Sequence, residues 1–420
     1  MSISQFADVS DIDAGLRRTP TKEYPLSFSL DEYANRLTRC REEMAHQGID
    51  LLYVTMPEGI CYLHGYEVSW YQGASTTHWC PATATVVHVD HDRLIFLAGE
   101  DPVPSAAEDR RPLTRDLNSH AQLAASLLKK EGWLHNGTVV GLEYWSYLPP
   151  RAVSDVQEAA FRAAGAKVVD GSSILRSVRR AKSPEEIKAL EHAARIGDLG
   201  LKAVAENFQP GMTHGEVYAE AMYAMLKAGG EVAGIPQAVQ PGWPQSTHLL
   251  PSRRQISEGE PFAVDIAGVY KRYHANIDRT MIWGEPTAEL LRMHASAKSA
   301  LDILCETAKA GTSLRTVNSA LRRHYIDTDI WQFHHYCGGY ELGIAFPPDW
   351  VGEFEWSVAD DAPTGIIEEN LVTNYENTFR NEDAKFAFPQ IAFSRDTMVY
   401  SATGARRLSA IPVELVVLGH

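Results

Sequence analysis

The pattern of apolar residues changes near residue 180, and this change constrains the fold more than any other feature of the sequence. Before it, short apolar runs such as "LLYVTM" at 51–56 alternate with segments of helical periodicity such as "SLDEYANRLTRCREEMAHQ" at 29–47. This alternation predicts an α/β layer. After it, long helices are interleaved with strands that meet through turns and hairpins, so we expect α+β architecture. The helices are expected at about 183–207, 214–229, 287–310 and 313–325.

The second half begins with a helix-initiation signal. Ser183 suits an N-cap position, Pro184 suits the first helical position, and two glutamates follow in the first turn. The boundary therefore lies close to residue 180. We expect two domains, residues 1–180 and 181–420, with the chemistry in the second.

The composition argues against several classes of partner. The formal net charge is −15, from 54 acidic and 39 basic residues, which disfavours nucleic acid and anionic membrane surfaces. The five cysteines are scattered without a C-x-x-C pair, so neither a disulfide framework nor a zinc ribbon is predicted. No apolar run approaches the roughly 18 residues of a membrane span, and the acidic N-terminal stretch does not fit a secretory signal. We expect a cytoplasmic protein that acts on a small molecule.

The stretch "AVDIAGVYKRYHANIDRTM", residues 263–281, predicts a β-hairpin with a turn at Gly268. Asp265 lies in the first strand, but Asn276 occupies the position eleven residues later where a second carboxylate would complete a metal cradle. An acid appears only at Asp278, two residues further on and hence on the same strand face. The hairpin is therefore either a defective metal site or a site that works without metal.

Together with "CGGYELG" and "NYENTF", this hairpin resembles the creatinase and methionine-aminopeptidase superfamily, whose catalytic domain has the pita-bread fold. The resemblance implies a smaller N-terminal α/β domain of creatinase type and a C-terminal catalytic pita-bread domain. It places the metal-ligand positions of the family's peptidases at Asp265, Asn276, Tyr340, Glu376 and Ser394. Only two of these are carboxylates, and a dinuclear site needs bridging carboxylates to offset the repulsion of its ions. We expect no metal and no other cofactor.

Two further stretches resemble creatinase, a member of the superfamily that works without metal. "FSLDEYANRLTR" resembles its opening helix, and "KSPEEIKALEHAARIGDLG" resembles its interdomain helix. This resemblance implies catalytic residues at His248, Asp278 and Glu376. Asp278 departs from the Glu of creatinase by one methylene, so we expect a substrate other than creatine.

Another stretch resembles ectoine hydrolase, a second metal-free relative. "GYELGIAFPPDWVGEF", residues 339–354, is similar to a loop of that enzyme, and "YKRYHANIDRT" is similar to one of its strands. The resemblance implies substrate contacts at Tyr340 and Glu353. We expect Asp265 to contribute to substrate binding as well.

The chemistry of these residue types agrees with the resemblance. Paired carboxylates bind a planar guanidinium or amidinium cation through charge-assisted hydrogen bonds, and histidine can move a proton to a departing nitrogen near neutral pH. The resemblance implies, and this chemistry agrees with, a metal-independent hydrolase that cleaves a C–N bond in a small guanidino or cyclic amidine compound. Attack by water and attack by a carboxylate both remain open.

An aromatic-rich stretch in the N-terminal half suggests how the chain assembles. Trp70 and Tyr71 lie in "YEVSWYQGASTTHW", residues 66–79, and the corresponding region of creatinase closes the active site of its partner subunit. We expect a homodimer in which this stretch borders the partner's site and contacts substrate. Two alternatives stay open: a metal-dependent Xaa-Pro aminopeptidase or prolidase, and a catalytically inactive pita-bread binding protein.

Overall fold

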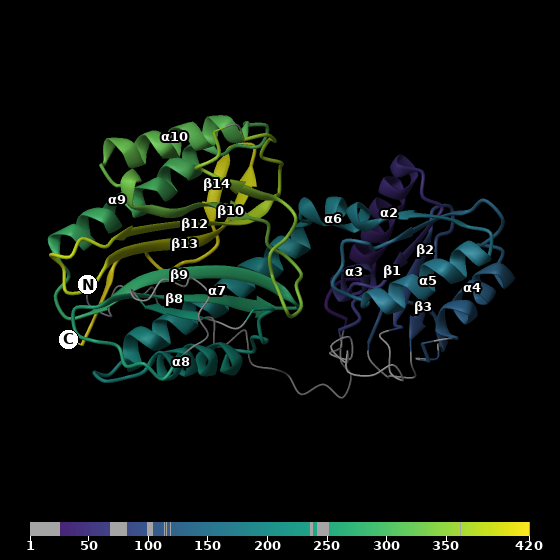
Figure 1. Cartoon of the computed structure of the whole chain (residues 1–420), viewed down its shortest axis with the longest axis horizontal. Coiled ribbons are helices and arrows are strands. Elements are labelled where there is room, and N and C mark those ends of the chain that lie inside the picture. Colours follow the sequence, from purple (N-terminus) through teal and green to yellow (C-terminus); the bar gives the residue numbers. More distant parts are fainter. Residues whose placement is uncertain are drawn as a thin grey trace. The chain divides into compact units, whose positions relative to one another are not determined.

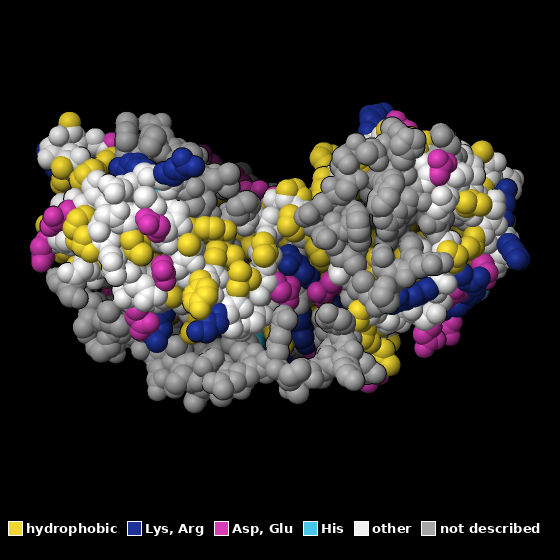
Figure 2. Space-filling model, turned by 90° about the horizontal axis from the view of Figure 1, so that it is seen from below, with side chains coloured by type: hydrophobic (Ala, Val, Ile, Leu, Met, Phe, Trp, Pro, Cys, Tyr) yellow, Lys and Arg dark blue, Asp and Glu magenta, His cyan; other side chains and the backbone are white. Residues whose placement is uncertain are grey.

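A computed structural model describes residues 26–67, 82–98, 104–112, 114, 116–117, 119–235, 238–241, 252–361 and 363–419. These residues divide into two compact units, and the chain passes from one to the other between Arg179 and Arg180 (Figure 1). Among the described helices, none is both long and apolar enough to cross a membrane. On the face drawn in Figure 2, Lys and Arg side chains are scattered among Asp and Glu.

The N-terminal unit is an α/β layer. Its described strands form a mixed sheet of order β4-β3-β2-β1-β5-β6, in which β1, β5 and β6 run parallel. Side chains such as Tyr53, Trp133 and Phe161 form its apolar core. The elements are α2 (Leu30–Gln47), β1 (Leu51–Val54), α3 (Pro57–His64), β2 (Ala84–His88), β3 (Leu94–Ala98), β4 (Asp109–Pro112), α4 (His120–Lys130), β5 (Val139–Leu142), α5 (Arg151–Ala163), β6 (Lys167–Asp170) and α6 (Ser172–Arg180).

The C-terminal unit is built on a sheet that has nine strands among the described residues, with the path β11-β10-β12-β13-β9-β8-β7. In addition, β14 pairs with β13, and β15 pairs with β9. The strands are β7 (Ala238–Pro241), β8 (Pro261–Tyr270), β9 (Tyr273–Trp283), β10 (His334–Tyr340), β11 (Glu355–Ser357), β12 (Val372–Asn381), β13 (Gln390–Ser401), β14 (Gly404–Arg407) and β15 (Val416–Leu418).

Four long helices of this unit confirm the helices expected from the sequence, with ends that differ by a few residues. They are α7 (Pro184–Asn207), α8 (His214–Lys227), α9 (Ala288–Thr307) and α10 (Leu314–Asp327), followed by a short 3₁₀ helix at Trp331–Phe333. The expected start of α7 is also confirmed. The Ser183 hydroxyl accepts a hydrogen bond from the main-chain N–H of Glu186, and the Glu186 carboxylate accepts one from the N–H of Ser183. This reciprocal pair satisfies two N–H groups at the start of the helix.

All four helices pack on one face of the sheet. Val264 and Ile277 share an apolar cluster with residues of α7 and α8, while Tyr375 and Phe379 share one with residues of α9 and α10. The two helix pairs nevertheless lie on opposite sides of the strands in Figure 1, so the sheet must curve away from them. Because successive side chains of a strand point to opposite faces, residues next to these apolar positions point into the inner side of the curve.

The turn of the β8–β9 hairpin is not at Gly268. Lys271 and Arg272 form the turn, with φ of 52° and 63°, and Gly268 lies within β8 opposite Ala275. A Cβ atom at Gly268 would lie 1.9 Å from the carbonyl oxygen of Ala193 in α7. The glycine is therefore required by the close approach of helix and strand rather than by chain reversal.

Candidate active site

Four charged residues stand in one row across the inner face of the sheet. Asp265 of β8 is paired with Asp278 of β9, Asp278 with Arg395 of β13, and Arg395 with Glu376 of β12. Residues that are opposite each other in adjacent strands project from the same face, with side chains about 5 Å apart. The sheet register therefore brings together three carboxylates from distant parts of the sequence.

The guanidinium of Arg395 binds all three carboxylates. Its Nη1 atom lies 2.6 Å from Oδ2 of Asp278 and 3.2 Å from Oδ2 of Asp265, and its Nε donates a 2.6 Å hydrogen bond to Oε2 of Glu376. The side chain of Arg395 is 4% exposed. One cation therefore neutralises only part of the charge of three acids, and a surplus of negative charge remains.

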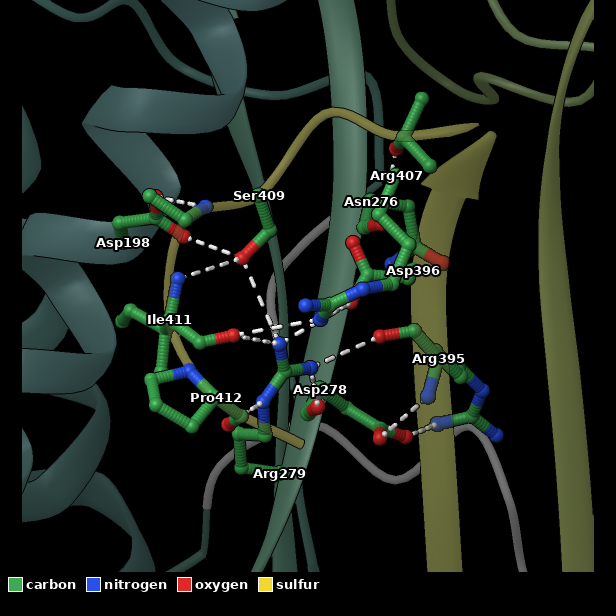
Figure 3. Close-up of polar contacts among 12 residues, drawn as sticks. Asp198, Asn276, Asp278, Arg279, Arg395, Asp396, Arg407, Ser409, Ile411 and Pro412 are labelled. Carbon is green, nitrogen blue, oxygen red and sulfur yellow. Dashed lines mark hydrogen bonds and ion pairs between the residues drawn. The ribbon is translucent and has the colours of Figure 1, made fainter. Parts of the chain in front are cut away.

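Asp278 is the internal member of the row. Its side chain is 0% exposed, and both of its oxygens accept hydrogen bonds from Arg395, one from the main-chain N–H at 2.9 Å and one from Nη1 (Figure 3). Burial raises the pKa of Asp278 to about 7, while the positive charge of Arg395 acts in the opposite direction. Asp278 is thus the close partner of Arg395, and its catalytic role remains a prediction.

Asp265 and Glu376 are the members of the row that are partly exposed, at 15% and 11%. Oδ1 of Asp265 accepts a 2.8 Å hydrogen bond from Nδ2 of Asn276, and Oε1 of Glu376 accepts a 3.0 Å bond from Nδ2 of Asn374. Nδ2 of Asn374 also lies 3.2 Å from Oδ1 of Asn276. The two amides thus connect the two acids. Sequence reasoning missed Asn374, although its position two residues before Glu376 places it on the same strand face.

Two tyrosines of β10 lie beside the acids. The main-chain N–H of Tyr340 donates to Oδ1 of Asn374 at 2.8 Å, and its hydroxyl accepts a 3.1 Å bond from Nε1 of Trp350. Burial, with the charges of Glu376 and Asp265, raises the pKa of Tyr340 well above the usual tyrosine value. Burial and the charge of Glu376 also raise the pKa of Tyr336. The buried hydroxyl of Tyr336 has no hydrogen-bond partner among the described residues.

The remaining predicted residues do not join this row. Glu353 is exposed, on the segment between β10 and β11, and its substrate contact remains a prediction. His248, Trp70 and Tyr71 lie outside the described residues.

A histidine of β9 lies on the same face but has both ring nitrogens engaged. Nε2 of His274 accepts a 2.8 Å hydrogen bond from the N–H of Gly234, and Nδ1 donates a 2.9 Å bond to the carbonyl of Arg272. Burial lowers the pKa of His274 to about 3. Both ring nitrogens of His274 are therefore engaged by the main chain, which leaves neither free for a bound substrate.

Ser394, which the resemblance placed at the last metal-ligand position, does not lie on the inner face. It is paired with Asn377 and Arg279 and points to the helix-covered face. Arg395 is the residue on the inner face. A shift of one residue in a strand exchanges its two faces, and the correct frame depends on pairing with β12 and β9 rather than on local sequence.

Comparison with known proteins identifies the family. A model described as metallopeptidase family M24 matches residues 188–400, and one described as the creatinase/prolidase N-terminal domain matches residues 36–181. The chain belongs to metallopeptidase family M24. The superfamily and the two-domain architecture expected from the sequence are thereby confirmed.

Several relatives of this M24 protein have assigned activities. Ectoine hydrolase from Halomonas elongata is 28% identical over 383 residues, which cover 83% of this chain and 90% of the relative. An Xaa-Pro dipeptidase from Pyrococcus horikoshii is 24% identical over 280 residues, which cover 66% of this chain and 74% of the relative. The crystal structure of an X-Pro aminopeptidase from Thermotoga maritima matches with a TM-score of 0.73 at 17% identity, over 91% of this chain and 99% of that one. The M24 protein is accordingly a hydrolase of this family.

The residues of the M24 protein do not fit a dinuclear metal centre. Asn276 directs its amide nitrogen, a donor, toward Asp265, and Tyr340 replaces the nitrogen ligand implied by the family. Arg395 places a guanidinium between the remaining carboxylates. Among the described residues, no group of three or more His, Cys, Asp or Glu side chains is arranged to hold a metal ion.

Proposed function

We propose that this M24 protein is a metal-independent hydrolase that cleaves a C–N bond in a small guanidino or cyclic amidine compound. The observation that supports this proposal is the excess of carboxylate over guanidinium in the row, with Asp265 and Glu376 as its partly exposed members. An organic cation bound beside them would complete the charge balance. A planar cation with several N–H donors suits carboxylates through charge-assisted hydrogen bonds.

The neighbouring neutral groups also suit such a substrate. Tyr336 and Tyr340 add aromatic surface and phenolic O–H groups that remain protonated at neutral pH. A delocalised cation gains further from the face of an aromatic ring. The unpartnered hydroxyl of Tyr336 would supply a hydrogen bond to a bound ligand.

Hydrolysis adds water across the C–N bond and delivers a proton to the departing nitrogen. We assign the proton transfer to His248, on the basis of the sequence resemblance alone. Water, or the carboxylate of Glu376 in a covalent route, would attack the carbon. Glu376 could either orient the attacking water or attack the carbon itself, because its carboxylate is partly exposed and is held by Asn374 and Arg395.

The experiment that tests this function compares three classes of substrate with one enzyme preparation. Purified protein treated with EDTA is incubated separately with ectoine, with creatine and with an Xaa-Pro dipeptide. Ectoine is included because the relative from Halomonas elongata is an ectoine hydrolase. Ring-opened product, urea or ammonia is measured by mass spectrometry and NMR. We expect turnover of an amidine or guanidino compound and none of the dipeptide.

A matched Glu376→Gln protein serves as the control for contaminating activity. Dipeptide cleavage that requires added manganese, cobalt or zinc would instead establish the peptidase alternative. Absence of turnover across guanidino and amidine compounds, with or without metal, would favour an inactive binding protein.

We also propose that the enzyme is a homodimer whose residues 66–79 border the partner's site. Subunits carrying His248→Ala are mixed with subunits carrying Trp70→Ala and Tyr71→Ala under conditions of exchange. Partial recovery of activity is expected, because one composite site of the mixed dimer would be intact. Demonstrated exchange without recovery would contradict a shared site.

A further inference from the structure

We propose that Lys182 is a positioning residue for the candidate active site. Its buried ion pair with Glu341 fixes the segment of residues 340–352, which carries Tyr340 and Trp350. The effect on substrate binding rests on the proposed function. The effect on the conformation of the segment does not, so the two can be tested separately.

The main chain around Lys182 is held by the residues that lead into β12, the strand of Glu376. The N–H of Lys182 donates a 2.9 Å hydrogen bond to the carbonyl of Asn370. Ala181 forms an isolated antiparallel bridge with Leu371. The backbone from which the lysine side chain extends is therefore fixed relative to the sheet of the C-terminal unit.

The ion pair of Lys182 and Glu341 is enclosed. The two side chains are 2% and 8% exposed, and Nζ of Lys182 lies 2.6 Å from Oε1 of Glu341. Nζ also donates a 3.1 Å hydrogen bond to the carbonyl of Arg180. A Cβ atom at Gly343 would lie 3.3 Å from Cε of Lys182, so the segment passes close to the lysine side chain. Each charge in such a location needs its partner, because an isolated buried ion loses its hydration.

Glu341 stands where the two ends of the segment meet. Its main-chain N–H donates a 2.7 Å hydrogen bond to the carbonyl of Phe354, and its carbonyl accepts a 2.8 Å bond from the N–H of Gly352. A Cβ atom at Gly352 would lie 2.7 Å from Cβ of Glu341, so these ends pack without room for a further side chain. A displacement of Glu341 would therefore move both ends of the segment.

Tyr340 directly precedes this closure and contacts the acid row. Its main-chain N–H donates to Oδ1 of Asn374, which in turn donates from Nδ2 to Glu376. Its hydroxyl accepts a hydrogen bond from Nε1 of Trp350 within the same segment. A change in the position of the segment would therefore change where Tyr340 and Trp350 lie beside the acids.

Stability alone does not account for a buried ion pair. Two apolar side chains of similar volume often stabilise a fold as well as such a pair does, because the ions lose their hydration. What the pair adds is direction, since the carboxylate of Glu341 must point at Nζ of Lys182. This requirement selects one conformation of Glu341 and of the segment that it closes.

Three variants separate positioning from stability. Lys182→Met leaves the carboxylate of Glu341 buried without this cation. The double variant Lys182→Met, Glu341→Met removes both charges and keeps side chains of similar length, so its stability should return toward that of the wild type. This variant guards against misfolding of the single one. Lys298→Met removes a lysine from a more exposed pair with Glu414 and is the matched control.

Amide hydrogen exchange tests the segment without any substrate. In both variants of the ion pair, we expect the N–H groups of Tyr340, Glu341 and Gly352 to exchange about tenfold faster than in the wild type, because their acceptors are no longer held in place. Exchange in Lys298→Met should equal that of the wild type. Wild-type exchange of all three amides in the folded double variant would overturn the inference.

Steady-state kinetics tests the effect on the site, with the guanidino or amidine compound that the wild type hydrolyses. Because Tyr340 is assigned to substrate binding, KM of the double variant should rise about tenfold while kcat changes by less than about threefold. A loss of folded protein alone would lower kcat and leave KM unchanged, and that result would contradict the positioning role. If the wild type hydrolyses none of these compounds, the proposed function fails and amide exchange decides the inference.

Discussion

Nη1 of Arg279 donates a hydrogen bond of 3.0 Å to the main-chain carbonyl of Arg395. The two side chains lie on opposite faces of the paired strands β9 and β13. The same Nη1 lies 2.6 Å from the carbonyl of Asp278 (Figure 3). Nη2 pairs with Asp396 at 3.0 Å. Arg279 thus holds together, from behind, the two main-chain positions that present Asp278 and Arg395 to the site.

We predict that Arg279→Lys destabilises the protein strongly. The side chain of Arg279 is buried, and lysine cannot supply a donor to every carbonyl that the guanidinium reaches, including that of Pro412. Each buried acceptor left without a donor costs about 1–3 kcal/mol, so we expect a loss of about 2–4 kcal/mol in urea unfolding. Arg407→Lys, at a more exposed pair with the same Asp396, should cost under about 1 kcal/mol. Equal losses in the two variants would contradict this role.

Glu376→Gln is predicted to lower kcat far more than it lowers stability. The substitution preserves shape but removes the charge that binds Arg395 and, in our proposal, the substrate or the attacking water. Loss of a group that acts in proton transfer or attack typically costs about 10² to 10⁴ in rate. Glu382→Gln, a surface position paired with Arg380, is the control and should keep full activity. Steady-state kinetics measures kcat of both variants, and circular dichroism checks that both are folded. A loss of kcat that accompanies a loss of folded structure would contradict the prediction.

The buried His274 is predicted to lower the free energy of unfolding as the pH falls below about 6.5, which is the ordinary pKa of histidine in an unfolded chain. In the folded state its pKa is about 3, so between these values the unfolded chain binds the proton and the folded chain does not. Stability is therefore lost toward acid, by at most about 1.4 kcal/mol per pH unit for one group. The raised pKa of Asp278 acts with opposite sign between pH about 4 and 7.

The contribution of His274 is isolated by comparison of variants rather than from wild type alone. Urea unfolding between pH 4 and 7 should show a shallower acid decline for His274→Gln than for wild type. The exposed His335 provides the control, and His335→Gln should leave the slope unchanged. An identical slope in His274→Gln and wild type would show that this ring does not resist protonation.

Gly268→Ala is predicted to cost more than about 3 kcal/mol, above the usual range for overpacking. The added methyl would lie 1.9 Å from the carbonyl oxygen of Ala193 and 2.5 Å from the nitrogen of Gly197, which are both main-chain atoms. By contrast, a Cβ at Gly215 in α8 would lie no closer than 3.4 Å to its neighbours. Gly215→Ala should be neutral or slightly stabilising, since alanine favours helix. Thermal unfolding of the two variants tests the difference.

Local sequence sufficed for the features that depend on one segment. The N-cap at Ser183, the four long helices and the parity that places Asn276 and Asp278 on one face of their strand all follow from spacing along the chain. Arg395 did not follow, because its neighbours in the row are set by the pairing of β13 with β9 and β12. Its hydrogen-bonded partner Asp278 is 117 residues away in the sequence.

Gly268 shows a second limit of sequence reasoning. A glycine in a hairpin pattern indicates a turn on composition alone, but here two non-glycine residues, Lys271 and Arg272, adopt the positive φ values. Glycine is needed at residue 268 because helix α7 packs closely against strand β8 there. The local sequence pattern does not indicate this contact.

The amide chain between Asp265 and Glu376 has a direction, and this direction limits which side chain can stand at residue 276. The main-chain N–H of Tyr340 can only donate, so Asn374 must present its oxygen there and its nitrogen toward Glu376. Asn276 in turn faces Asp265 with its nitrogen. An aspartate at residue 276 would set a carboxylate against the carboxylate of Asp265, and neither could donate to the other. The hydrogen-bonded chain therefore depends on an amide at residue 276, which donates to Asp265 and accepts from Asn374.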